Sequence, residues 1–183
     1  MSRPRGRPAQ GQGLALEDIL SAALVLLNEG GGQGLTMRAL ASRLGTSPMS
    51  LYHHVGDHEG LLRMLSDRVY AEVLEGLAPQ ADARADIRAL LARYHHTVGQ
   101  HPQLTLAIFA APNAFAGVTR QITERLTSLL AGITAEPALW RDILVDHAHG
   151  SGLALACAGQ MQYEKALDQL LNCLAGSAKL SNR

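Results

Sequence analysis

Cysteine and aromatic residues are scarce in this chain, and each scarcity narrows the possible functions. The two cysteines, Cys157 and Cys173, stand sixteen positions apart, a spacing that gives no support for a zinc ribbon or a dithiol redox motif. So few cysteines favour a reducing compartment. Aromatic residues make up 4% of the sequence and hydrophobic residues 47%. A core must therefore come mainly from Leu, Ala, Val and Ile, a composition that favours helices.

Long apolar runs and alternating strand patterns are also missing. No apolar segment precedes position 19, and the apolar residues after it are interrupted by Ser21, Asn28 and Glu29. Neither a signal peptide nor a membrane span is predicted. No run of alternating apolar and polar residues is bounded by turn residues, which argues against a sheet. We therefore expect an all-α fold, a cytoplasmic location and no membrane partner.

The chain as a whole has no excess of positive or negative charge, but its N-terminus is basic. The formal net charge is zero, which argues against a chain that coats nucleic acid regardless of sequence. Arg3, Arg5 and Arg7 nevertheless form a basic arm without acids. The segment Pro4–Pro8 (PRGRP) is typical of an AT-hook, in which glycine lets the backbone approach the minor groove and Arg5 and Arg7 enter it. The alternative is a solvated basic tail.

The most informative stretch of the sequence spans 35–55. Thr36 is a good N-cap for a first helix, and Gly45 suits the end of that helix because glycine accepts positive φ at no steric cost. Ser47, followed by a proline, suits the cap and first turn of a second helix. Two short helices with glycine in a tight turn are a helix-turn-helix, whose second helix enters the DNA major groove. The two helices are expected over 36–44 and 47–54.

Helical periodicity continues on both sides of this stretch. Residues 16–29 repeat apolar residues at i, i+3, i+4 and i+7, which predicts a supporting helix ended by the glycines at 30 to 32. Prolines and polar turns separate the later helical segments. Those segments are expected over 58–77, 84–99, 102–110, 114–132, 136–158 and 161–175, with a loop over 79–86 and a polar tail from 176.

Several short segments around the helix-turn-helix carry a family pattern. They are Gly34–Ala41 (GLTMRALA), Leu44–Gly45 and Leu51–Val55 (LYHHV), flanked by Ala22-Ala23, Leu26-Leu27 and Leu61-Leu62. With this spacing, the run from Leu20 to Leu65 resembles the DNA-binding domain of the TetR (tetracycline-repressor) family. Two positions depart from the family pattern. Thr46 stands where Val is usual, and His58 stands where relatives have a Lys that contacts a DNA phosphate.

The resemblance implies the organisation and the function of the chain. In the family, a C-terminal helical domain binds a small molecule and forms the dimer. We expect a flexible basic arm (1–14), a helix-turn-helix DNA-binding domain with a connecting helix (15–77), and a ligand-binding and dimerisation domain (78–183). The expected function is a sequence-specific transcriptional regulator, a homodimeric repressor released from a palindromic double-stranded DNA operator by a small-molecule effector.

The expected reading surface is poor in base-reading side chains. Residues 47–54 contain no Arg, Lys, Asn or Gln, so bidentate contacts to bases are unavailable from this helix. Met49 can pack on a thymine methyl group, and the resemblance implies that Arg38 reaches base edges while Tyr52 touches phosphates. The expected DNA-contacting residues are Arg5, Arg7, Thr36, Arg38, Thr46, Ser47, Met49, Ser50, Tyr52, His53, His54 and His58.

The C-terminal half offers candidates for an effector pocket and for a dimer face. Its few bulky or polar-tipped side chains suit a mostly apolar pocket for an apolar or amphipathic effector, with ordinary core residues as the alternative. These candidates are Tyr94, His95, Phe109, Phe115, Trp140 and Met161. Small and apolar residues on the last two long helices suit a dimer face, with an intramolecular core as the alternative. The candidates for that face are Leu139, Ile143, Ala154, Leu167, Leu170, Leu171 and Leu174.

Metal and catalytic sites are not predicted. His147 and His149 follow Asp146, but residues two apart on a helix point about 200° from each other and cannot share one ion. The chain has no G-x-S-x-G motif and no loop that would cradle phosphates. We expect no metal, no cofactor and no enzymatic activity. The alternatives are a constitutive architectural DNA-binding protein that uses the basic arm, and a small helical metal-binding protein or enzyme.

Overall fold

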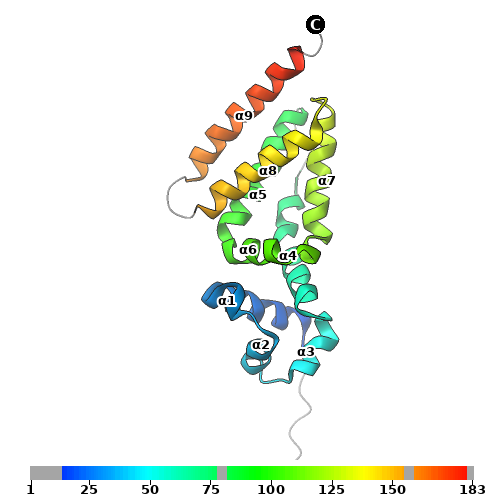
Figure 1. Cartoon of the computed structure of the whole chain (residues 1–183), viewed down its shortest axis with the longest axis vertical. Coiled ribbons are helices and arrows are strands. Elements are labelled where there is room, and N and C mark those ends of the chain that lie inside the picture. Colours follow the sequence, from blue (N-terminus) through cyan, green and yellow to red (C-terminus); the bar gives the residue numbers. More distant parts are fainter. Residues whose placement is uncertain (1–13, 78–81, 155–158, 181–183) are drawn as a thin grey trace, which may run out of the picture.

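The protein is helical throughout the part that this computed structural model describes, residues 14–77, 82–154 and 159–180, and no strand occurs in those ranges (Figure 1). This confirms the predicted all-α class. The helices are α1 (Leu16–Gly34), α2 (Met37–Arg43), α3 (Pro48–Val55), α4 (His58–Leu74), α5 (Ala83–Gln100), α6 (Pro102–Ala110), the short 3-10 helix η1 (Pro112–Ala114), α7 (Gly117–Ala131), α8 (Pro137–Leu153) and α9 (Gln160–Leu180).

Helices α1, α2 and α3 form a compact unit at one end of the molecule (Figure 1). Helices α1 and α2 contact each other, and Ile19 and Leu27 of α1 and Leu40 of α2 are fully buried members of one core. Leu51 and Val55 of α3 complete this small core with exposures of 0% and 2%. Because the apolar stripe of α3 faces inward, its opposite face is left to solvent.

Several predicted helix ends are wrong. Helix α1 continues to Gly34 instead of ending at 29, although its backbone departs from helical geometry at Gly31, where φ is 60°. Helix α7 begins at Gly117 and not at 114, because η1 precedes it. Helix α8 ends at Leu153, short of the predicted 158, and α9 extends to Leu180, past the predicted 175.

Helix α4 joins the three-helix unit to the rest of the chain. Its first turn is capped by Asp57, whose Oδ1 accepts the N–H of Gly60 at 2.7 Å. Further along, Asp67 Oδ1 accepts the N–H of Val118 at 2.7 Å and so caps the start of α7. One helix is therefore fixed both to the helix-turn-helix and to the C-terminal helices.

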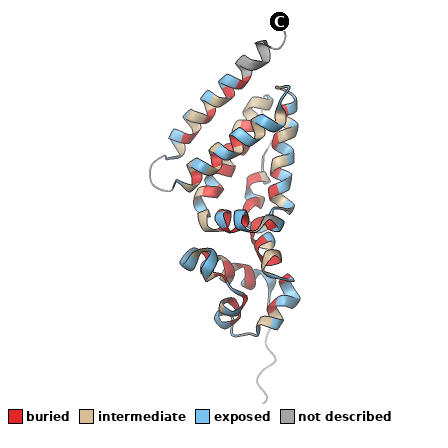
Figure 2. Cartoon of the chain, viewed as in Figure 1, coloured by how far each residue is buried: buried red, intermediate tan, exposed pale blue. Residues whose placement is uncertain are grey.

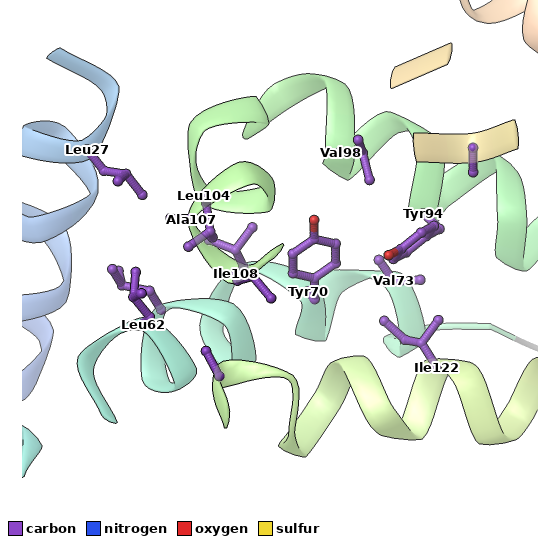
Figure 3. Packing of buried hydrophobic residues seen from close by; sticks show 14 of the residues in the cluster. Leu27, Leu62, Tyr70, Val73, Tyr94, Val98, Leu104, Ala107, Ile108 and Ile122 are labelled. Atoms are coloured by element: carbon purple, nitrogen blue, oxygen red, sulfur yellow. The ribbon is translucent and has the colours of Figure 1, made fainter. Parts of the chain in front are cut away.

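One apolar core runs through both halves of the molecule (Figure 3). Leu27 and Leu62 lie on the side of the helix-turn-helix, and Ile108 of α6 lies between them and the C-terminal helices. Beyond it, Tyr70 of α4 packs near Tyr94 of α5, with ring centroids 5.5 Å apart. The two halves are therefore packed against each other through α6 and α4.

Burial follows the faces of the helices (Figure 2). In the described part of the chain each helix carries buried residues toward its neighbours and exposed residues on the opposite side. Helix α9 lies along the outside of the C-terminal half, where it contacts α5 and α8 (Figures 1 and 2). Among the described helices, none combines the length and the apolar character needed to cross a bilayer.

Candidate nucleic-acid interface

The two helices of the helix-turn-helix begin at side-chain caps. Thr36 Oγ1 accepts the N–H of Ala39 at 3.1 Å, and Ser47 Oγ accepts the N–H of Ser50 at 3.2 Å. Gly45 between them has a φ of 63°, the left-handed region that glycine adopts without strain. The predicted caps and turn are therefore confirmed, and they fix the direction in which α3 leaves α2.

One face of α2 and α3 is exposed. Met49 is 65% exposed and Tyr52 is 41% exposed, and His53 and His54 are exposed beside them. Arg38, in the first turn of α2, is exposed as well. The structure thus leaves five of the predicted DNA-contacting residues exposed on these two helices, and we call this exposed set the α2–α3 face. It combines a guanidinium, two imidazoles, a phenol and a thioether.

The remaining predicted contacts are placed less favourably. Thr46 and Ser50 are half-buried. The hydroxyl oxygens of Thr36 and Ser47 already accept backbone N–H groups, which leaves each of them an O–H donor and one further acceptor lone pair for DNA. Arg5 and Arg7 of the predicted AT-hook lie outside the described residues.

The expected phosphate contact of His58 is not supported. Its Nε2 lies 3.1 Å from the carbonyl oxygen of Leu35, in a half-buried position. A carbonyl oxygen only accepts hydrogen bonds, so Nε2 is the donor and is already used within the protein. The short sequence pattern did not reveal this, because the two residues are 23 positions apart.

A second contact that the sequence did not reveal joins the ends of α1 and α2. The Arg43 guanidinium makes a bidentate pair with Glu29, with contacts of 2.6 and 3.1 Å. The hydrogen bonds from Arg43 lower the pKa of the Glu29 carboxyl. Arg43 is therefore held toward α1, whereas Arg38 at the other end of α2 faces solvent.

Two of the residues predicted for an effector pocket contact a common neighbour. Tyr94 Oη lies 2.6 Å from His149 Nε2, and the Phe109 ring packs edge-on to His149 with centroids 4.8 Å apart. Burial raises the pKa of Tyr94 and lowers the pKa of His149, so both are neutral near pH 7. Phe109 is 51% exposed, which leaves one side of this Tyr94–Phe109–His149 cluster open to solvent.

The other pocket candidates have different surroundings. His95 is buried, with Nδ1 2.9 Å from Gln160 Oε1 and Nε2 3.2 Å from Ser151 Oγ, and its ring stacks on Tyr163. Three candidates lie on different elements with little in common: Phe115 precedes α7 at 49% exposure, Trp140 is half-buried near the start of α8, and Met161 is 70% exposed at the start of α9.

The predicted dimer residues divide into two groups. Leu167, Leu171 and Leu174 are at most 2% exposed, so the same chain already covers them. That placement contradicts their assignment to a face open to a second copy. Leu170 is half-buried, Ala154 is exposed as the C-cap of α8, and Leu139 and Ile143 are 51% and 38% exposed.

The two histidines considered for a metal site point to different neighbours. The His147 ring stacks on Tyr163, with centroids 5.2 Å apart, whereas His149 packs against Tyr94 and Phe109. This agrees with the divergence expected from their spacing. Within the ranges that the structure describes, no three His, Cys, Asp or Glu side chains are grouped to hold a metal ion.

These features define a helical protein with a helix-turn-helix at one end and a separate group of packed helices behind it. Residues 19–65 match the family model of the bacterial regulatory proteins, tetR family. An HTH-type transcriptional regulator of Saccharopolyspora erythraea is 35% identical over 107 residues, covering 56% of this chain and 45% of that protein. An uncharacterized HTH-type transcriptional regulator of Mycobacterium tuberculosis is 35% identical over 144 residues, covering 73% of this chain and 65% of the relative.

Solved structures share the fold over nearly the whole chain. Mycobacterium smegmatis BioQ superimposes with a TM-score of 0.75 over 89% of this chain and 98% of that one, at 24% identity. BioQ with its natural double-stranded DNA operator gives a TM-score of 0.70 over 88% and 98%, at 23% identity. Residues 19–65 are therefore a DNA-binding domain of the tetR family of bacterial regulatory proteins, and the rest of the chain shares the fold of the solved structures. The chain spans less than two thirds of the length of the two curated relatives.

Proposed function

We propose that this chain is a sequence-specific DNA-binding regulator that acts as a dimeric repressor. The observation that carries the proposal is the α2–α3 face, where Arg38, Met49 and Tyr52 are exposed on two capped helices. The operator complex of BioQ, which has the same fold, supports DNA as the partner. Such a regulator acts where the chromosome is, which places its action in the cytoplasm.

The composition of the face determines how it would read DNA. Arg38 donates hydrogen bonds to base edges, and Met49 offers apolar contact to thymine methyl groups. Tyr52 and the imidazoles of His53 and His54 donate to phosphates, which positions the helix without selecting a sequence. With a single exposed arginine of α2 on this face, part of the discrimination depends on DNA shape.

Two copies of the face are needed for a palindromic operator. A symmetric dimer places its reading helices about 34–36 Å apart, one turn of DNA. Helix α8 offers Leu139 and Ile143 as exposed apolar residues, and a partner that covers them removes apolar surface from water. We therefore assign the dimer contact to the exposed side of α8 and not to the buried leucines of α9.

A small-molecule effector is proposed to act through the Tyr94–Phe109–His149 cluster. The exposed side of Phe109 offers an apolar surface, and the neutral Tyr94–His149 pair offers hydrogen bonds. An apolar or amphipathic molecule suits this combination. Binding there would favour one arrangement of α6, which packs between this cluster and α1, and a ligand that prefers that arrangement shifts the population toward it. A thermal-shift screen of such compounds, followed by DNA release assays, tests this assignment, and a compound that stabilises the protein without releasing DNA contradicts it.

Selection from a pool of random-sequence duplexes tests the main proposal. The wild-type chain should enrich a palindrome, and Tyr52→Ala should weaken binding to all duplexes about equally. Arg38→Ala should reduce discrimination by about 1–3 kcal/mol at each base pair that the guanidinium reads. Arg125→Ala, which removes an exposed arginine from α7, is the matched control and should change neither. Failure of the wild type to enrich any sequence contradicts the proposal.

The alternative of an architectural protein that binds through its basic arm gives a different result. Deletion of residues 1–13 should leave a regulator its operator preference with some loss of affinity, because the α2–α3 face remains. An arm-driven binder should instead lose most of its binding. Filter-binding titrations of the truncated chain against the selected palindrome and a scrambled duplex separate these outcomes.

A further inference from the structure

The imidazole of His58 connects two parts of the helix-turn-helix that are distant in sequence. His58 is the first residue of α4, and its Nε2 lies 3.1 Å from the carbonyl oxygen of Leu35. Leu35 is 2% exposed and directly precedes Thr36, the cap of α2. The hydrogen bond therefore joins the residue before α2 to the residue that follows the turn after α3.

The turn between α3 and α4 holds His58 in a fixed relation to the reading helix. Gly56 has a φ of 77°, and its N–H donates to Tyr52 O at 2.9 Å. Asp57 Oδ1 accepts the N–H of Gly60 at 2.7 Å. A Cβ atom on Gly60 would lie 2.2 Å from the backbone oxygen of Val55. This close backbone packing means that a contact made by His58 also sets the position of α3.

We propose that His58 is a positioning residue, which closes the helix-turn-helix by tying the residue before the α2 cap to the start of α4, directly after the turn that ends α3. The bond keeps Arg38, three residues after Leu35, in a constant geometry relative to Tyr52. The side chain acts through the protein and not through a DNA phosphate, because a neutral imidazole has one N–H and that proton is donated to Leu35. This inference deepens the proposed function and depends on it only where DNA binding is measured.

Stereochemistry provides matched variants. In both His and Gln, Nε2 is three bonds from Cβ, whereas the Asn side-chain nitrogen is two bonds away, like the imidazole Nδ1. His58→Gln should therefore keep the bond to Leu35, while His58→Asn and His58→Leu should lose it. Removing the partner of a buried carbonyl should raise the unfolding equilibrium constant about tenfold. Equal stability of His58→Gln and His58→Asn would overturn the inference.

The salt dependence of DNA binding separates positioning from phosphate contact. On the palindrome selected by the wild type, His58→Asn should bind several-fold more weakly, with an unchanged slope of log K against log salt. Removal of a direct contact between a charged imidazole and a phosphate would instead reduce that slope by about 0.9, and this result would overturn the inference. His96→Asn changes an exposed histidine of α5 and should alter neither affinity nor slope.

The protonated nitrogen of His58 can be observed without DNA. At a pH where the imidazole is neutral, 15N NMR of the wild-type protein should find the proton on Nε2 of His58 and a bare Nδ1. The opposite tautomer would overturn the inference and leave the proposed regulator function intact. Failure of the wild type to select a palindrome would contradict the proposed regulator function and leave the inference about His58 intact, since the NMR result does not depend on DNA. The two proposals can thus fail separately.

Discussion

The helix starts of the helix-turn-helix and the packing of the C-terminal helices depend on different kinds of polar contact. In the helix-turn-helix, Thr36, Ser47 and Asp57 each accept a backbone N–H three residues further on. In the C-terminal half, side chains of separate helices pair with each other, as Tyr94 does with His149. The comparison teaches that the helix starts of the helix-turn-helix are specified by local sequence. The contacts that join helices, in either half, depend on residues that are distant in the chain.

Ion pairs also join α9, the outer helix of the C-terminal half, to α5. Arg88 of α5 contacts Glu164 at 3.0 Å and Asp168 at 2.8 Å on α9. These hydrogen bonds raise the pKa of Arg88, and hydrogen bonds from Gln160 and Arg88 lower the pKa of Glu164. Side chains this exposed contribute below about 1 kcal/mol, and salt screens them. The buried leucines of α9, and not this network, therefore supply most of its attachment to α5.

The largest expected loss of stability comes from a substitution in the turn of the helix-turn-helix. Gly60→Ala places a Cβ 2.2 Å from the backbone oxygen of Val55, and the backbone cannot yield cheaply, so we expect a loss of about 3 kcal/mol in the free energy of unfolding. Gly30→Ala is the matched control, since a Cβ there meets nothing within 4 Å and a helical alanine should gain up to about 1 kcal/mol. Urea unfolding measures both, and wild-type stability of Gly60→Ala contradicts the described turn.

A smaller effect is expected from breaking one pair in the C-terminal half. Tyr94→Phe leaves His149 Nε2 without its partner at a half-buried position, which should cost about 1 kcal/mol. Tyr52→Phe removes a hydroxyl from a residue that is 41% exposed and should leave stability unchanged. In a double-mutant cycle with His149→Leu, the double variant should lose less stability than the sum of the two single variants. Either single substitution already removes the hydrogen bond, so the second cannot remove it again. Additive losses would show that the hydroxyl and the imidazole do not interact.

The smallest effect is a graded dependence of stability on pH that arises in the C-terminal half. Burial lowers the pKa of His95, His101, His147 and His149. A lowered native pKa means that the unfolded chain binds protons first as the pH falls. Stability from these groups is therefore complete above about pH 6.5 and declines below it. Thermal unfolding of the wild type between about pH 7.5 and 5.5 should show this decline, and a rise in stability over the same range contradicts it.

The sequence was informative where the structural signal is local. The caps at Thr36 and Ser47 and the turn at Gly45 depend on residues within a few positions of each other, so the two helices were predicted to within a residue at each end. The bond from His58 to Leu35 and the pair of Arg43 with Glu29 span 23 and 14 positions. No local pattern encodes such contacts, and both were found only in the structure.

The same reasoning explains the errors in the C-terminal half. An apolar stripe on α9 shows that Leu167 and Leu171 are covered, but periodicity cannot distinguish cover by the same chain from cover by a second copy. The structure assigns both to the core of their own chain. Likewise, the sequence gives no reason to prefer Phe109 over Phe115 as a pocket residue. In the structure Phe109 of α6 packs on His149 of α8, whereas Phe115 lies in the segment between η1 and α7.

Oxidative footprinting of methionines tests the central claim, that the α2–α3 face contacts DNA, most directly. Met49 is 65% exposed on that face and Met161 is 70% exposed on α9, so both thioethers should oxidise at similar rates in the free protein. Addition of the selected duplex should slow the oxidation of Met49 several-fold and leave the rate at Met161 unchanged. Unchanged oxidation of Met49 in a fully bound complex would contradict the account.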